Sequence, residues 1–190
     1  MNKVIVGITG YLGSGKSTAL KYFKEHGFYI IDADEIVHKL YEPENDGWRK
    51  INDFFGPEYI LKNGKVNRKK LAKTVFCNPA KLRILEKIIH PIVFNEMSKE
   101  IQANKSDKIA IEAIRFDEKR IGAKLTHTVW VEADHDTAYK RVIEKRKLSR
   151  EDYDKLISYQ KKPFKIDFVI ENNGSLKDLK KQIEKVVERI

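Results

Sequence analysis

The stretch Gly10-Tyr11-Leu12-Gly13-Ser14-Gly15-Lys16-Ser17 has the pattern G-x-x-x-x-G-K-S, which is typical of a phosphate-binding loop. Residues 4–9 before it form a short apolar run that predicts a buried strand, and residues 18–24 after it are typical of a helix. Glycines let the backbone N–H groups curl around phosphate oxygens, and a helix N-terminus adds its partial positive charge. Lys16 is expected to reach the β- and γ-phosphates, and the Ser17 hydroxyl to bind Mg²⁺. The alternative is a plain glycine-rich turn, but the strand, motif and helix in register favour a nucleoside triphosphate site made by Gly13, Ser14, Gly15, Lys16, Ser17 and Thr18.

The composition favours one globular domain without a membrane-spanning segment. The 190 residues suit a single domain with room for a small insertion or lid. Hydrophobic residues make up 41% and charged residues 35%, a balance that is typical of globular chains. No apolar run approaches the roughly 20 residues that cross a bilayer. Cys77 is the only cysteine, and the first strand begins too early to leave room for a signal peptide, so a cytoplasmic protein is expected.

The net charge of +10 raises the question of a polyanionic partner. Nucleic acid, a membrane surface, polyanionic small molecules and a merely solvated basic surface are all compatible with such a charge. The chain has no alternating aromatic and basic run that would stack single-stranded bases, and no helix-turn-helix or zinc-finger spacing. We therefore expect a small-molecule substrate rather than nucleic acid.

Strand and helix patterns alternate along the chain, with one long helical interruption. Besides residues 4–9, strand patterns occur at residues 28–31, 108–113, 127–132 and 166–170. Alternation of this kind predicts an α/β fold with a parallel sheet flanked by helices. Residues 35–105 contain hardly any strand signal, so they are predicted as a helical insertion into a core of residues 1–34 and 106–190.

Several helix boundaries can be predicted from single residues. Asn67, Ser149 and Ser175 are candidate N-caps, and Asn78 is a cap residue followed by a proline at the first helical position. Pro91 is expected to break or kink its helix after His90.

Two aspartates follow the second predicted strand and are candidates for phosphoryl-transfer chemistry. Asp32 and Asp34 should lie at the carboxyl edge of the sheet, where ligands bind in open α/β folds and where the phosphate-binding loop also lies. Phosphoryl transfer to an alcohol requires a proton acceptor and a carboxylate that holds the metal or its waters. The alternative is that Asp34 only caps the next helix and Asp32 only forms a turn.

Six basic residues lie between Lys140 and Arg150, after the fourth predicted strand. In small kinases a lid at this place carries arginines that neutralise the transferring phosphoryl group. A solvated helix face is the other interpretation, and Arg141 is the favoured phosphate contact because it lies nearest the sheet edge. His38 and His90 have no second histidine or cysteine at a metal-ligand spacing, so a structural role or a polar contact to substrate is expected for both rather than a catalytic role. Arg68 could bind an acidic group of the substrate or be a surface charge.

The sequence resembles the dephospho-coenzyme A kinase family over nearly its whole length. The resemblance rests on the loop motif from residue 8 to residue 18, on Ile31-Asp32-Ala33-Asp34 with His38, on residues 64–72, on His90-Pro91, and on Gln160 with residues 167–174. It implies a P-loop kinase fold, with a nucleotide core, a helical substrate-binding domain over residues 35–105 and a short lid over about residues 145–163.

The resemblance also implies a reaction and a set of roles. ATP with Mg²⁺ would phosphorylate the 3′-hydroxyl of dephospho-coenzyme A, the last step of coenzyme A synthesis. Asp34 would be the catalytic base, together with Lys16 and Arg141, and Asp32 would help to organise metal or substrate. Ser17 and Asp32 are the expected metal ligands, and the acceptor is expected to contact Asp32, His38, Arg68 and His90.

This sequence departs from the family pattern in the substrate and lid regions. Residues 113–117 replace the usual P-L-L-F-E-like run, and Lys145 and Leu156 stand where arginines are expected. Lysine keeps the charge of arginine but lacks its planar bidentate fork. Two alternatives therefore remain open, a kinase of the same fold for another acceptor such as a nucleoside monophosphate, and a degenerate nucleotide-binding regulatory module.

Overall fold

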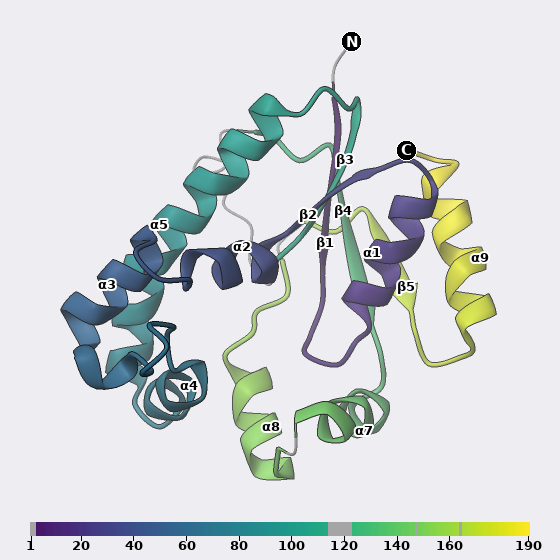
Figure 1. The fold of residues 1–190 in the computed structure, drawn as a ribbon. Coiled ribbons are helices and arrows are strands. Elements are labelled where there is room, and N and C mark those ends of the chain that lie inside the picture. Colours follow the sequence, from purple (N-terminus) through teal and green to yellow (C-terminus); the bar gives the residue numbers. More distant parts are fainter. Residues whose placement is uncertain (1–2, 114–122, 147, 164) are drawn as a thin grey trace. The chain divides into compact units, whose positions relative to one another are not determined.

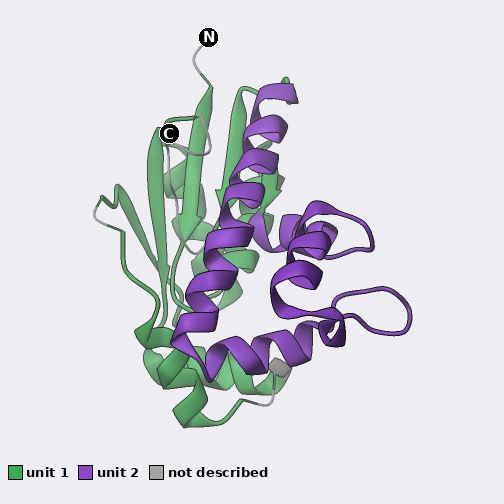
Figure 2. Cartoon of the chain, turned by 90° about the vertical axis from the view of Figure 1, so that its left-hand side faces the viewer, with its two compact units in different colours: residues 1–32, 104–118, 123–190 green, residues 33–103, 119–122 purple. Residues whose placement is uncertain are grey.

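The computed structural model describes residues 3–113, 123–146, 148–163 and 165–190 (Figure 1). The chain divides into two compact units, which Figure 2 shows in different colours. The sheet unit comprises residues 1–32, 104–118 and 123–190, and the helical unit comprises residues 33–103 and 119–122.

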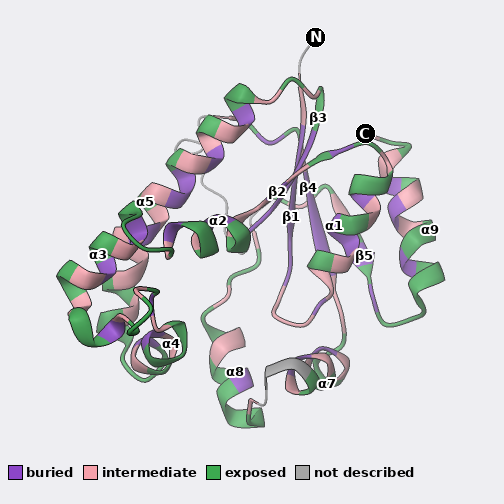
Figure 3. Cartoon of the chain, viewed as in Figure 1, coloured by how far each residue is buried: buried purple, intermediate pink, exposed green. Residues whose placement is uncertain are grey.

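The sheet unit is built on five parallel strands in the order β2-β3-β1-β4-β5. Their bounds are β1 Val4–Thr9, β2 Tyr29–Asp32, β3 Lys108–Glu112, β4 His127–Glu132 and β5 Phe168–Glu171. The central strand β1 is buried along nearly its whole length, as the colours of Figure 3 show. Apolar runs buried on both faces are what an interior parallel strand requires. The order and direction of the strands confirm the predicted α/β fold with a parallel sheet.

Within the described residues, the helices of the sheet unit are α1 Lys16–Glu25, α7 His135–Arg146, α8 Arg150–Ser158 and α9 Leu176–Val187. Helices α1 and α9 lie side by side against the sheet and enclose a core that includes Val6, Ile8, Phe23, Ile170 and Ile183. Helices α7 and α8 form a second, smaller core from Ala138, Val142 and Tyr153, on which Leu12 also packs. The loop after β1 is therefore anchored to α7 and α8.

The helical unit contains α2 Ala33–Leu40, α3 Asp46–Phe55, the short 3₁₀ helix η1 Pro57–Tyr59, α4 Arg68–Phe76 and α5 Pro79–Ala103. Helix α5 packs against α2, α3 and α4. No helix within the described ranges is both long and apolar enough to cross a membrane.

Of the predicted break or kink at Pro91, the break is wrong, because α5 continues through Pro91 to Ala103, and the kink stays a prediction. A proline inside a helix costs about 3 kcal/mol. Ile89, Val93 and Phe94 are buried on either side of it, and each such burial contributes about 1.5–3 kcal/mol. Tertiary packing thus outweighs the local preference of proline.

The predicted helix caps are confirmed. The side chains of Asn67, Ser149 and Ser175 each accept a hydrogen bond from the backbone N–H three residues later. The Asn78 side chain accepts hydrogen bonds from the N–H groups of Ala80 and Lys81.

Candidate active site

The loop between β1 and α1 has the backbone form of a phosphate cradle. Gly13 and Gly15 have φ values of +84° and +95°, in the left-handed region that favours glycine. Gly15 is also the residue before α1, and no side chain caps that helix. The first N–H groups of an uncapped helix lack partners within the helix and attract anions.

Neither glycine has room for a side chain. A Cβ on Gly13 would lie 2.9 Å from Val142 Cγ2 and closer still to the carbonyl oxygen of Ala138, both on α7. A Cβ on Gly15 would overlap the side-chain amide of Asn172. The motif glycines therefore have two roles. They allow the backbone to turn, and they let the loop pack closely against α7 and Asn172.

The side chain of Lys16 folds back over the loop. Its Nζ donates hydrogen bonds to the carbonyl oxygens of Gly10, at 2.9 Å, and Tyr11, at 3.1 Å. The ammonium group is thus held against the backbone at the start of the loop. Ser17, one residue further into α1, is exposed, and Thr18 is half-buried.

Arg141 lies beside this loop. Its Nη1 atom is buried and has no hydrogen-bond partner among the described residues, and it lies 4.0 Å from where a Cβ on Gly15 would be. The Ser14 hydroxyl is likewise buried without a partner in the described part of the chain. Buried donors without partners are costly, because each loses its hydrogen bonds to water. Two of them at the cradle fit a site built for phosphate oxygens.

Two carboxylates end neighbouring strands in the sheet unit. Asp32 ends β2 and is in register with Glu112, which ends β3, so that the two residues lie side by side at the carboxyl edge. Glu112 is also in register with Ile8 of β1, directly before the phosphate-binding loop. We did not predict Glu112 from the sequence, because only the strand register places it next to Asp32.

No group of three or more histidine, cysteine or carboxylate side chains suited to a metal occurs among the described residues. Mg²⁺ in kinases is usually held by one or two carboxylates, waters and substrate phosphates rather than by such a cage. The donor set of Asp32, Glu112 and the Ser17 hydroxyl, all in the sheet unit, is of the type that Mg²⁺ takes with a bound nucleotide.

The other predicted residues belong to the helical unit. Asp34 and His38 lie one turn apart on α2 and are both exposed, whereas Ile36 and Leu40 of the same helix are buried. A shared exposed face is what a pair of ligand-binding side chains requires, and it is also what a solvated helix shows.

Arg68 and His90 lie on α4 and α5. Burial raises the pKa of Tyr41 to about 12, and the nearby Arg68 charge opposes that rise. His90 is half-buried and its ring makes an edge contact with Phe94, at a centroid distance of 6.0 Å.

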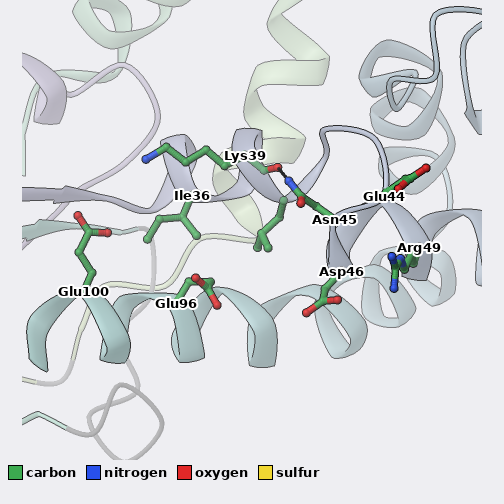
Figure 4. Close-up of a pocket in the computed structure, with 9 residues that line it drawn as sticks. Ile36, Lys39, Glu44, Asn45, Asp46, Arg49, Glu96 and Glu100 are labelled. Carbon is green, nitrogen blue, oxygen red and sulfur yellow. Dashed lines mark hydrogen bonds between the residues drawn. The ribbon is translucent and has the colours of Figure 1, made fainter. Parts of the chain in front are cut away.

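The helical unit also contains a cavity of about 370 Å³ (Figure 4). Its lining comes from α2, from the segment before α3, from α3 and from α5: Ile36, Lys39, Leu40, Glu44, Asn45, Asp46, Arg49, Glu96 and Glu100. None of the predicted site residues lines it. Carboxylates outnumber cations in this cavity, so its charge does not match a phosphorylated acceptor.

Three side chains that we did not assign to the site hold the phosphate-binding loop. The Asn172 amide donates a 2.8 Å hydrogen bond to the carbonyl of Ser14. The Tyr153 hydroxyl donates to the Leu12 carbonyl, at 3.1 Å, and Gln160 Oε1 accepts from the Leu12 N–H, at 2.9 Å. These residues come from α8 and from the segments that follow α8 and β5.

The basic cluster between Lys140 and Arg150 divides into different roles. Arg150 donates to Asp136, at 2.7 Å, and lies 2.8 Å from the ring of His135, so it joins α8 to α7. Its hydrogen bond lowers the pKa of Asp136. The described residues do not include Lys147, the side chain of Lys145 or residues 114–117, which belong to the segment that differs from the family pattern.

The whole chain is similar to dephospho-CoA kinases. The model of the family described as dephospho-CoA kinase matches residues 4–178. A dephospho-CoA kinase from Fusobacterium nucleatum is 38% identical over 195 aligned positions, which cover 100% of both chains.

Solved structures agree with the sequence comparison. The crystal structure of a protein from Thermus thermophilus matches with a TM-score of 0.79 and 29% identity, over 100% of this chain and 99% of that one. A dephospho-CoA kinase from Campylobacter jejuni matches with a TM-score of 0.62 and 29% identity, over 98% and 97% of the two chains. The chain therefore belongs to the dephospho-CoA kinase family and is an ATP-dependent phosphotransferase.

Proposed function

We propose that this chain transfers the γ-phosphoryl group of ATP to the 3′-hydroxyl of dephospho-coenzyme A, with Mg²⁺ as the metal. The observation that carries the proposal is the pairing of a complete phosphate cradle with the buried, unpartnered Nη1 of Arg141 next to Gly15. Backbone N–H groups of the loop and the Lys16 ammonium bind the phosphates. Arg141 stabilises the negative charge of the transferring group, since fixed donors are most effective in a site with little water.

Ser17 and Asp32 would hold Mg²⁺, with Glu112 orienting its water ligands. The ion would neutralise charge on the β- and γ-phosphate oxygens. Because Asp32 ends β2 and α2 begins at Ala33, the next carboxylate, Asp34, is our proposed base for the acceptor hydroxyl. Its carboxylate would accept the proton as the hydroxyl oxygen attacks phosphorus.

The acceptor is proposed to bind through Asp32, His38, Arg68 and His90. Arg68 supplies a positive charge for a phosphate of the acceptor, and the histidines supply ring nitrogens for polar contacts. A cytoplasmic location also stays a prediction.

The test is ADP release with Mg²⁺ and ATP in the presence of dephospho-coenzyme A, of each nucleoside monophosphate, or of no acceptor. We expect release above the blank only with dephospho-coenzyme A. We expect Lys16→Ala to lower turnover by about 10²–10³-fold while its circular dichroism matches wild type. Faster turnover of a nucleoside monophosphate would reassign the acceptor, and release equal to the blank with every acceptor would favour a regulatory nucleotide-binding module.

A further inference from the structure

Tyr153 of α8 is buried against the phosphate-binding loop. The residue is 1% exposed, and its ring contacts the rings of Tyr139, at 5.4 Å, and His135, at 5.3 Å. Its hydroxyl donates to the carbonyl oxygen of Leu12. Burial raises the pKa of this hydroxyl, so it remains a donor at neutral pH. A tyrosine at a helical core position needs no such contact for packing, because its ring alone fills the space.

The geometry of the peptide group shows what this contact can do. A peptide is planar and trans, so its C=O and N–H point in opposite directions. In the preceding peptide the Leu12 N–H faces Gln160, and the Tyr11 carbonyl faces the Lys16 ammonium on the other side. In the next peptide the Leu12 carbonyl faces Tyr153 of α8, so the Gly13 N–H points away from the Tyr153 hydroxyl.

We propose that Tyr153 is a positioning residue for phosphate binding, whose hydroxyl holds the Leu12–Gly13 peptide so that the Gly13 N–H is aimed at the phosphate oxygens. This inference rests on the proposed function, in which the loop binds the phosphates of ATP. The hydroxyl never touches the nucleotide, and it acts through the backbone of the loop.

Helix α8 is held firmly enough to give the hydroxyl a fixed place. His135 at the start of α7 contacts the Asp154 carboxylate through Nε2, at 2.8 Å. The Arg150 guanidinium forms hydrogen bonds with the His135 ring and the Asp136 carboxylate. On the other side of the loop, the position of a Gly13 Cβ is blocked by α7. The peptide therefore has little freedom to rotate while the Tyr153 hydrogen bond is present.

The decisive variant is Tyr153→Phe, which removes the hydroxyl and keeps the ring. The matched control is Tyr139→Phe, because Tyr139 belongs to the same ring cluster but its hydroxyl makes no hydrogen bond in the described part of the chain. Calorimetric titration measures the Kd of two probes, ATP with Mg²⁺ and inorganic tripolyphosphate. Steady-state kinetics give KM for ATP and for dephospho-coenzyme A separately.

One neutral hydrogen bond is worth about 0.5–1.5 kcal/mol, so Tyr153→Phe should weaken binding of both probes by roughly 2- to 10-fold. KM for ATP should rise by a similar factor, KM for dephospho-coenzyme A should stay unchanged, and the control should match wild type. All titrations are made at a temperature where circular dichroism shows every variant fully folded, so that a lower Tm does not affect the comparison.

The proposal is overturned if Tyr153→Phe binds tripolyphosphate and ATP as tightly as wild type, even with a lower Tm. It is also overturned if Tyr139→Phe weakens binding equally. Failure of the proposed function looks different: wild type would not bind tripolyphosphate, or Lys16→Ala would bind ATP as tightly as wild type does.

Discussion

Gly13→Ala tests how tightly the phosphate-binding loop is packed. A residue other than glycine at φ +84° costs about 1–2 kcal/mol, because its Cβ approaches the following carbonyl oxygen. The new Cβ would also lie 2.9 Å from both the Ala138 carbonyl carbon and Val142 Cγ2, and overpacking of this kind costs about 1–3 kcal/mol. We therefore expect the free energy of unfolding to fall by about 2–5 kcal/mol.

Gly27→Ala is the control, because Gly27 has a nearly equal φ of +82° and nothing within 4 Å of its Cβ position. It should lose only the conformational part, about 1–2 kcal/mol. The gain from restricting the unfolded chain is common to both variants and cancels in their difference. Urea unfolding followed by circular dichroism measures both. If the free energy of unfolding fell equally in the two variants, α7 would have moved to accommodate the new Cβ without a measurable cost. The argument that the loop is tightly packed against α7 would then be wrong.

Three further predictions concern catalysis and acid stability. Asp34→Asn should lower kcat far more than it weakens ATP binding, and Asp32→Asn should raise the Mg²⁺ requirement; an unchanged kcat in the first variant would reassign the base. Arg141→Ala should lower kcat at saturating ATP and acceptor by about 10²-fold, and a loss below about threefold would contradict a role at the phosphoryl group. Hydrogen bonds from Ser175 lower the pKa of Asp178 from its ordinary 3.8. The Asp178 carboxylate therefore stabilises the fold fully above pH 3.8, and this contribution is lost as the pH falls through the lower pKa that Asp178 has in the folded protein. Asp178→Asn should therefore flatten the fall of Tm on acidification, and an acid limb identical to that of wild type would contradict this.

Features determined by neighbouring residues could be predicted from the sequence. The phosphate-binding loop is a run of consecutive residues, so its strand, glycines and helix are given together. The N-caps at Asn67 and Ser175 depend only on the next three residues, and both are confirmed. The parallel sheet follows from the alternation of strand and helix patterns.

Features that depend on distant residues could not be predicted. Tyr153 resembles any core tyrosine until the fold brings it to Leu12, and Asn172 resembles a turn residue until it meets Ser14. Glu112 is simply the last residue of a strand until the register sets it beside Asp32. The helix continues through Pro91 for a related reason, because distant packing overrides a local preference. Arg141 was singled out by position and does lie by Gly15, while its catalytic role stays a prediction.

The central place of β1 also bears on how the chain folds. Val4 pairs with Lys108, and residues 33–103 of the helical unit lie between these partners in the sequence. Closing so long a loop is entropically unfavourable, and the cost falls only by about 0.6 kcal/mol for each halving of the loop. The contacts within α2 to α5 are more local and form faster. We therefore expect pulse-labelling of backbone amides during refolding to show protection in α5 before β1. The phosphate-binding loop, which follows β1, should be among the last parts of the chain to form.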